Sequence, residues 1–143
     1  MNQFLRSLSV LLFCAMLLAC DYELTSEDHL TKAKTFLEQS DPTSAIVELK
    51  NALKKDVNNS RASSLLGKLY VEAGSYEDAD KELSRALSTG EDATVIVPML
   101  AKVLLNLGEF ERLDALALDG LDPENRSVVQ AAKGLSMIYR DNP

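Results

Sequence analysis

Aromatic residues, histidine and cysteine are all scarce in this sequence. Tryptophan is absent, aromatics make up 6% of the 143 residues, and there are one histidine and two cysteines. So few imidazole and thiolate groups leave little from which to build a metal site. The formal net charge is -7, and an acidic surface repels the phosphates of nucleic acids. We therefore expect no metal, no cofactor and no nucleic-acid partner.

Motifs for catalysis are missing as well. The sequence contains no glycine-rich phosphate loop, no nucleophile elbow and no paired-carboxylate motif. His29 stands among charged residues, so we expect an exposed, solvated side chain there and not a general base. We predict that the protein has no catalytic residues and is not an enzyme.

The first nineteen residues have the features of a secretory signal peptide. Arg6 precedes a wholly apolar run over residues 10–19, and that run is shorter than the roughly 20 residues that a membrane-spanning helix needs. The run ends in the letters LLAC, which resemble the lipobox of bacterial lipoproteins. That resemblance implies cleavage after Ala19 and attachment of lipid to Cys20. The alternative is an ordinary signal peptide that is cut elsewhere.

Cys20 and Asp21 are the residues expected to anchor the protein and to determine its membrane. Several acyl chains on one cysteine would anchor the protein firmly, whereas a single chain is marginal. An aspartate after the lipidated cysteine resembles the enterobacterial signal for retention in the inner membrane. Residues 20–25 form the predicted tether that follows the cleavage site. The alternative is that Asp21 is simply the first residue of an acidic tether. We expect a lipid-anchored, periplasm-facing protein of a Gram-negative envelope, in the inner rather than the outer membrane.

The rest of the chain repeats with a period of 34 residues. Residues 26–59 and 60–93 can be superimposed without a gap. Small residues recur in fixed columns, which lets two antiparallel helices approach closely, and this period is typical of the tetratricopeptide repeat. The columns include Ala33, Gly67 and Ala101; Phe36, Tyr70 and Leu104; Ala45 and Ala79; and Ala52 and Ala86. We predict an all-α superhelix, an α-solenoid of about three and a half helical hairpins.

The turn residues agree with this period. Residues 40–42, 74–76 and 108–110 each separate two helical runs. Glycine can adopt the left-handed conformation that ends a helix, and Pro42 suits the first turn of the next one. Residues 56–59 read DVNN, where these repeats usually carry DPNN between units, so Val57 replaces a proline.

A third unit over residues 94–123 departs from the pattern. Proline at position 123 arrives early, which predicts a short second helix. Pro98 lies near the start of the first helix. Because proline disturbs a helix interior, we expect that helix either to start late, near Val97, or to have a distorted first turn.

Residues 124–143 are predicted to form the first helix of an incomplete fourth unit. Its polar strip is narrow and consists of Gln130, Lys133, Ser136 and Arg140. A terminal capping helix has a broad polar outer face, so we expect apolar side chains of this helix, among Val129, Leu135, Met137 and Ile138, to be exposed. We predict that the protein can self-associate through this helix.

The predicted mature chain as a whole resembles one family, the TPR-repeat lipoprotein of the PEP-CTERM/exosortase system (PrsT-type). The resemblance lies in the lipobox, the short tether and the segments AIVELKNALKKD, LLGKLYVEAG and LGEFE, in that order and spacing. Family members are longer and are linked with exopolysaccharide production and protein sorting. The resemblance implies a membrane-anchored scaffold that binds proteins or peptides of the cell envelope.

Two other roles fit the same features. One is a TPR lipoprotein of another envelope machine, such as outer-membrane protein assembly or pilus biogenesis. The other is a non-catalytic accessory subunit of a glycosyltransferase.

Three lysines recur at the repeat period: Lys34, Lys68 and Lys102. The resemblance to TPR proteins implies that this column faces a concave groove. A row of lysines there would attract the carboxylates of a peptide C-terminus or of an anionic polysaccharide. The alternative is local pairing four residues along the helix, with Glu38 and Glu72.

Overall fold

The structure, a computed structural model, describes residues 23–141, and these residues form helices and turns without a strand. Cys20 and Asp21 therefore lie outside the described residues. The helices are α2 (Ser26–Glu38), α3 (Pro42–Lys55), α4 (Ser60–Ala73), α5 (Tyr76–Ser88), α6 (Ala93–Leu107), α7 (Phe110–Asp114) and α8 (Pro123–Asp141). None of these helices is both long enough and apolar enough to cross a membrane.

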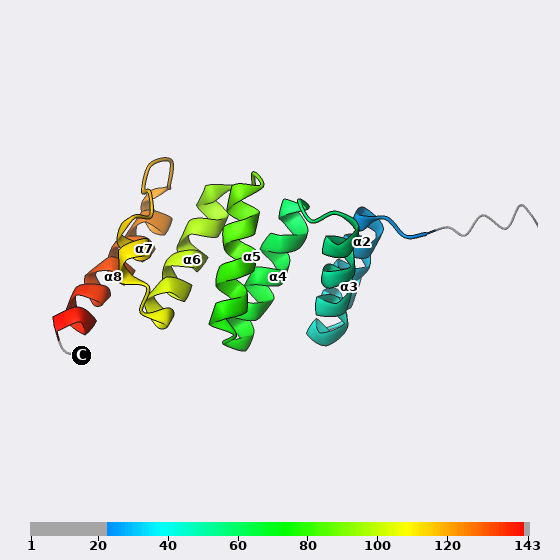
Figure 1. The fold of residues 1–143 in the computed structure, drawn as a ribbon, viewed down its shortest axis with the longest axis horizontal. Coiled ribbons are helices and arrows are strands. Elements are labelled where there is room, and N and C mark those ends of the chain that lie inside the picture. The colour runs from blue at the N-terminus through cyan, green and yellow to red at the C-terminus, as the bar shows by residue number, and fades with distance from the viewer. Residues whose placement is uncertain (1–22, 142–143) are drawn as a thin grey trace, which may run out of the picture.

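Successive helices pair as antiparallel hairpins that stack along the long axis of the molecule (Figure 1). Helix α2 packs on α3, α4 on α5, and α6 on the short α7, while α8 packs against α6. The predicted all-α solenoid is confirmed. The second helix of the third unit is short as predicted, since α7 contains only 5 residues, but it ends well before Pro123, which is the first residue of α8.

The turn inside each hairpin uses the same backbone device. One residue just after the first helix of each hairpin has a positive φ. This φ is 59° at Ser40, 74° at Gly74 and 72° at Gly108. This left-handed residue lets the next N–H donate back to a carbonyl five residues earlier, which closes the helix end. The bonds run from Asp41 to Phe36, from Ser75 to Tyr70 and from Glu109 to Leu104, each with an N–O distance of 2.9 Å.

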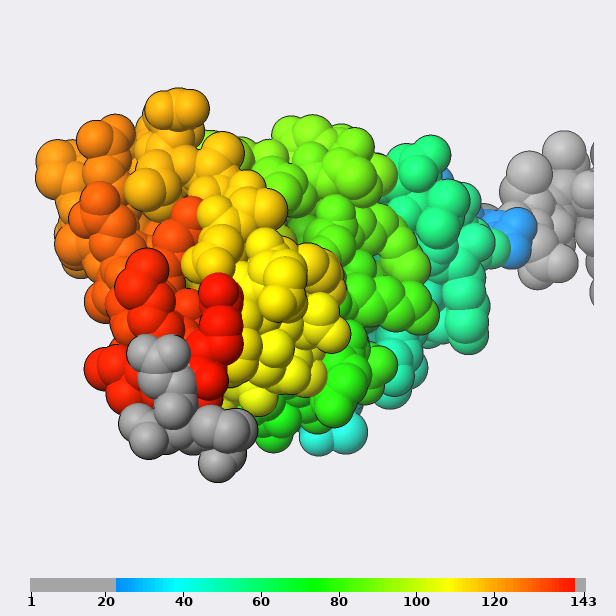
Figure 2. Space-filling view, turned by 60° about the vertical axis from the view of Figure 1, so that its left-hand side comes forward, coloured from blue at the N-terminus to red at the C-terminus, as the bar shows by residue number. Residues whose placement is uncertain are grey.

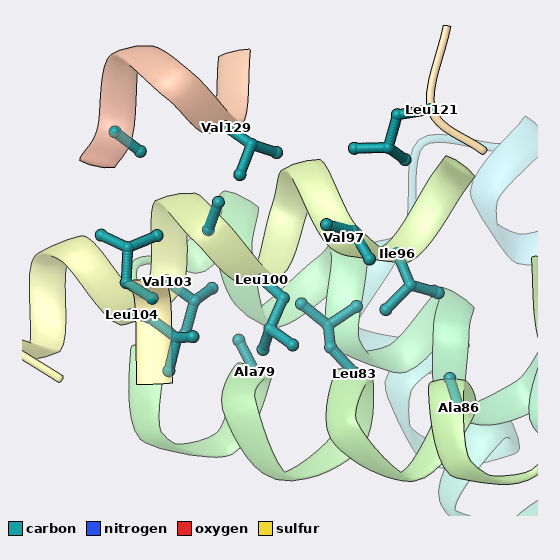
Figure 3. Close-up of a cluster of buried hydrophobic side chains, with 13 residues drawn as sticks. Ala79, Leu83, Ala86, Ile96, Val97, Leu100, Val103, Leu104, Leu121 and Val129 are labelled. Carbon is teal, nitrogen blue, oxygen red and sulfur yellow. The ribbon is translucent and has the colours of Figure 1, made fainter. Parts of the chain in front are cut away.

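Two clusters of buried side chains form the core. One comprises apolar residues of α2, α3 and α4, and the other begins at α5 and continues through α6 to α8. Figure 3 shows the second, where Leu83 of α5 and Leu100 of α6 face one another and Val129 of α8 points down onto α6. Tyr70 packs against both clusters. The two halves of the core therefore meet at α4.

Gly67 shows why small residues recur at the repeat period. A Cβ atom added there would lie 2.8 Å from the side chain of Leu83, which is fully buried. The corresponding residues Ala33 and Ala101 are also fully buried. These columns are thus the points where the two helices of a hairpin cross closely.

Helix α6 excludes one of the two alternatives considered for Pro98, the late start. It begins at Ala93, not near Val97, and Pro98 lies inside it. The Asp92 carboxylate accepts a hydrogen bond from the backbone N–H of Thr94 at 2.8 Å and caps the earlier start. Burial of Ile96 and Val97 holds this first part of the helix on the core, so the packing compensates for the hydrogen bond that Pro98 cannot make.

Helix α8 corrects an expectation. Ser136, expected on a polar outer strip, is fully buried, and the Lys133 ammonium donates inward to the carbonyls of Asp114 and Leu116 at 2.8 and 2.9 Å. The end of α7 and the segment after it leave carbonyls without helical partners, and α8 lies close enough for Lys133 to supply a donor. Ser136 follows Lys133 by three residues, so it lies on the same side of α8.

The apolar side chains of α8 divide between buried and exposed positions. Val129 is fully buried, which corrects its place among the residues expected to be exposed. Exposed apolar side chains lie elsewhere around the helix: Val128, Leu135, Met137, Ile138 and Tyr139 are each more than two-fifths exposed. Of these, Tyr139 lines a pocket beside the turn between α6 and α7. In Figure 2 this helix, drawn in orange and red, lies at the end of the stack.

Candidate functional site: a groove on the first helices

A groove of about 400 Å³ runs across the first helices of three successive hairpins. Helix α2 contributes one wall, α4 the middle and α6 the other wall. The residues that line it are Lys34, Arg61, Ser64, Leu65, Lys68, Glu91, Val95 and Met99.

Lys34 and Lys68 lie together in this groove. Each follows the small residue that packs against the second helix of its own hairpin, so its side chain points to a different side of the helix. Both lysines are exposed. Lys102 is exposed too, but it does not line the groove. The structure therefore brings together two of the three predicted lysines.

The alternative of local pairing holds for one lysine only. The Lys68 ammonium lies 4.0 Å from the Glu72 carboxylate, at the limit of an ion pair. Within residues 23–141 no ion pair joins Lys34 to Glu38. Exposed pairs of this kind contribute little free energy, so both ammonium groups can turn toward a ligand.

Arg61 is a groove residue that the sequence reasoning missed. Its guanidinium donates to the Glu27 carboxylate at 3.0 Å. Glu27, Arg61 and Val95 occupy one column of the repeat, 34 residues apart. Equivalent positions of stacked hairpins lie side by side. Opposite charges at positions 34 residues apart could therefore have predicted this ion pair. The ion pair joins the first two hairpins and leaves the two lysines as the groove's other cations.

The rest of the groove lining is mainly apolar. Leu65, Val95 and Met99 come from α4 and α6, and Val95 is 51% exposed. Glu91 is the lone carboxylate among the lining residues. A groove that combines cations with an apolar floor can hold a chain that carries both a carboxylate and a hydrophobic side chain.

His29 does not have the exposed position that its sequence neighbours suggest. It is only 9% exposed, and its Nδ1 lies 2.6 Å from a carboxylate oxygen of Glu48 on α3. Stacking α2 against α3 buries this ring and supplies the carboxylate, a pairing that local sequence does not reveal. Among the described residues, no cluster of His, Cys, Asp and Glu could hold a metal ion.

Comparison with known families gives one match. Residues 36–96 match the family described as tetratricopeptide repeat, a segment that runs from α2 into α6. No curated protein sequence matches the chain significantly. The hairpins within residues 36–96 are thus similar to tetratricopeptide repeats. Such repeats generally mediate protein–protein interactions, which supports a role as a protein-interaction scaffold with protein partners.

Proposed function

We propose that this protein is a non-enzymatic scaffold, anchored by a lipid to the inner membrane of a Gram-negative bacterium. It faces the periplasm and holds envelope proteins that act in exopolysaccharide export and in PEP-CTERM protein sorting. The observation that carries the proposal is the groove, where Lys34 and Lys68 of neighbouring hairpins flank an apolar floor. The lipobox letters before Cys20 support the anchor.

The groove's ligand is a peptide C-terminus. Two exposed ammonium groups suit a terminal carboxylate, and Leu65, Val95 and Met99 suit an apolar side chain beside it. Lys102 extends the same column by one repeat beyond the groove and adds attraction at longer range. An anionic polysaccharide also carries carboxylates, but it has no apolar side chain to pack against the apolar floor of the groove.

Peptide binding to the full-length chain in detergent tests this ligand. The probe is a fluorescent peptide that ends in two leucines and a free carboxylate, and its control is the same peptide as a C-terminal amide. We expect only the free acid to bind, and the double substitution Lys34→Gln and Lys68→Gln to weaken it about tenfold. The charge-matched variant Lys54→Gln and Lys81→Gln, on the second helices, should bind normally. Equal binding of acid and amide would refute the assignment.

The anchor has its own test. Mass spectrometry of the mature protein should find a diacylglycerol-modified, N-acylated Cys20, and Cys20→Ser should remain unprocessed or soluble. An unmodified mature chain would rule the anchor out. Density-gradient fractionation should place the wild type with the inner membrane and shift Asp21→Ser away from it. Wild type in the outer-membrane fraction would refute retention by Asp21.

Loss of the protein should lower secreted exopolysaccharide and cause PEP-CTERM proteins to be missorted in the bacterium that makes it. Expression of the wild type should restore both, and expression of the Lys34→Gln, Lys68→Gln variant should not. Unchanged polysaccharide secretion in the deletion strain would favour a different envelope machine as the client.

A further inference from the structure

A second cleft lies on the other helices of the same hairpins. It measures about 450 Å³ and runs between α3 and α5, the second helices of the first two hairpins. Its lining residues are Lys50, Leu53, Lys54, Val57, Leu66, Tyr70, Asp78, Lys81, Glu82 and Arg85. None of these residues lines the groove that contains Lys34 and Lys68.

Both walls of this cleft present basic side chains at helical spacing. Lys50 and Lys54 stand four residues apart on α3, and Lys81 and Arg85 stand four apart on α5, so each pair shares one face of its helix. The chain has a net charge of -7, so a cleft with four basic side chains is a positively charged region on an acidic protein.

The carboxylates in the cleft cancel only part of this charge. Glu82 is 6% exposed and holds the Arg85 guanidinium at 2.8 Å. That pair leaves three lysine ammonium groups and the carboxylate of Asp78 in the lining. All three lysines are exposed, and the Lys54 ammonium makes one long contact, 3.5 Å, to the amide oxygen of Asn51.

The floor and mouth of the cleft are aliphatic. Leu66 is nearly fully buried beneath it, whereas Val57 is 56% exposed at its edge. Val57 is the residue that stands where these repeats usually carry proline. The ammonium of Lys50 lies 5.8 Å from the centre of the Tyr70 ring, over its face. Because that cation occupies the ring, the ring is a poor platform for stacking a sugar.

We propose that this cleft is a second binding site, which takes an acidic segment of a partner protein with aliphatic side chains between its carboxylates. The three lysines pair with glutamate or aspartate side chains, while Leu53, Val57 and Leu66 receive a leucine or valine. Recognition needs no peptide end, so the segment can be internal to its protein. The scaffold would then hold two different partners on opposite sets of helices.

The probe for this site is a fluorescent twelve-residue peptide of alternating leucine and glutamate pairs, amidated at its C-terminus. We expect it to bind the full-length chain in detergent, and to bind more weakly as salt rises, because exposed charge pairs are screened. Lys54→Gln with Lys81→Gln should raise the dissociation constant about tenfold. Val57→Ser should raise it by a smaller factor. A peptide with glutamine in place of glutamate should not bind.

Two controls separate this site from the groove on the first helices. The Lys34→Gln, Lys68→Gln variant removes the same charge and should bind the amidated peptide as the wild type does. If that variant loses binding and Lys54→Gln with Lys81→Gln does not, the peptide sits in the groove and the second site is refuted, while the proposed function stands. If neither variant alters binding, or the peptide does not bind at all, the inference also fails.

The remaining outcome concerns the class of ligand. Oligogalacturonate, a chain of uronic acids, should bind far more weakly than the peptide. Binding of oligogalacturonate that depends on Lys54 and Lys81, without binding of the peptide, would overturn the assignment to a protein segment and make the cleft a polysaccharide site.

Discussion

Polar side chains inside a helical stack are tolerated to different degrees, and two buried serines show the range. Ser63 of α4 and Ser136 of α8 are both fully buried. The Ser136 hydroxyl donates to the carbonyl of Lys133 at 2.7 Å, whereas the Ser63 hydroxyl has no hydrogen-bond partner among the described residues. Ser63 occupies the column of His29 in the previous unit. The column of Glu48, which binds His29, carries Glu82 in the second unit, but Glu82 accepts from Arg85. The second unit thus keeps the carboxylate, while the serine that replaces the histidine does not bond to it.

Removing the unpaired hydroxyl should stabilise the protein. We expect Ser63→Ala to raise the free energy of unfolding by about 1 kcal/mol, since a buried group without a partner costs its full desolvation. Ser136→Ala is the matched control and should be neutral or destabilising, because it removes a satisfied bond. Urea unfolding followed by circular dichroism measures both. A loss of stability in Ser63→Ala would mean that a partner, such as a buried water, satisfies this hydroxyl.

Ser40 offers a second test at this scale. It adopts a φ of 59° where the next two hairpins carry glycine. The left-handed conformation costs a residue with a Cβ about 1–2 kcal/mol. Glycine avoids this cost, but it loses more conformational entropy on folding, which offsets part of the gain. We expect Ser40→Gly to raise the melting temperature and Gly74→Ala to lower it. Gly74 has no atom within 4 Å of an added Cβ, so its loss would report backbone strain alone.

Contacts between helices decide how each unit is held to the next. Helix α7 has only 5 residues, too few to bury much surface, yet its Arg112 makes a two-pronged ion pair with Asp80 of α5. Both N–O distances are 2.7 Å. These hydrogen bonds, followed by one from Ser84, lower the pKa of the Asp80 carboxyl, while burial acts in the opposite direction.

This ion pair predicts a pH dependence. Because the folded-state pKa of Asp80 is below its unfolded value of about 3.9, the pair's contribution is fully present above that value. It is lost as the pH falls through the lower folded-state pKa. Arg112 is 45% exposed, so we expect Arg112→Gln to cost only about 1 kcal/mol at neutral pH. The difference from wild type should shrink in urea melts at about pH 2.5. A deficit independent of pH would mean that the loss is one of packing.

Helix crossings provide a matched pair of glycines. An added Cβ at Gly67 would meet Leu83 at 2.8 Å, whereas at Gly134 of α8 it would meet nothing within 4 Å. Gly67→Ala should therefore destabilise the protein by about 1–2 kcal/mol through overpacking, even after the gain in helix propensity. Gly134→Ala should stabilise it by up to about 1 kcal/mol. Destabilisation in Gly134→Ala would indicate that another helix already packs there.

The whole molecule is a row of hairpins, and the sequence predicts this row well. A period of 34 residues with small residues in register requires helices that cross closely, and Gly67 against Leu83 is such a crossing. The left-handed turns at Gly74 and Gly108 follow from glycine alone. These features are local or strictly periodic, which is why residue order is enough to predict them.

Features that depend on a particular neighbour were harder to predict. Burial of His29 depends on Glu48 on the next helix, and the inward position of Lys133 depends on carbonyls at the end of α7 and just beyond it. The pairing of Arg61 with Glu27 required comparison of one column across two units. In each case the sequence shows the side chain, and only the packing of one hairpin on another shows its partner.

The outer face of α8 predicts how whole molecules behave toward one another. Leu135, Met137 and Ile138 are each at least 45% exposed on one helix, and a contiguous apolar patch tends to become covered. We expect the full-length chain in mild detergent to associate as its concentration rises in sedimentation velocity. Met137→Gln with Ile138→Gln should reduce this association. Val47 of α3, which is 52% exposed, provides the control Val47→Gln, which should have no effect. Association that persists in the α8 variant would place the contact elsewhere.

The way in which the two core clusters are joined has a mechanical consequence. Hairpins stacked in a row carry a pulling force in series, so most of the extension occurs at the most compliant junction. The Gly67–Leu83 crossing ties the two clusters together inside the α4–α5 hairpin, whereas α3 and α4, which join the first hairpin to the second, share far fewer contacts. Under tension along the stack we expect the molecule to bend and open first between α3 and α4, with the part on each side remaining stiff, as a jointed rod does and a uniform spring does not.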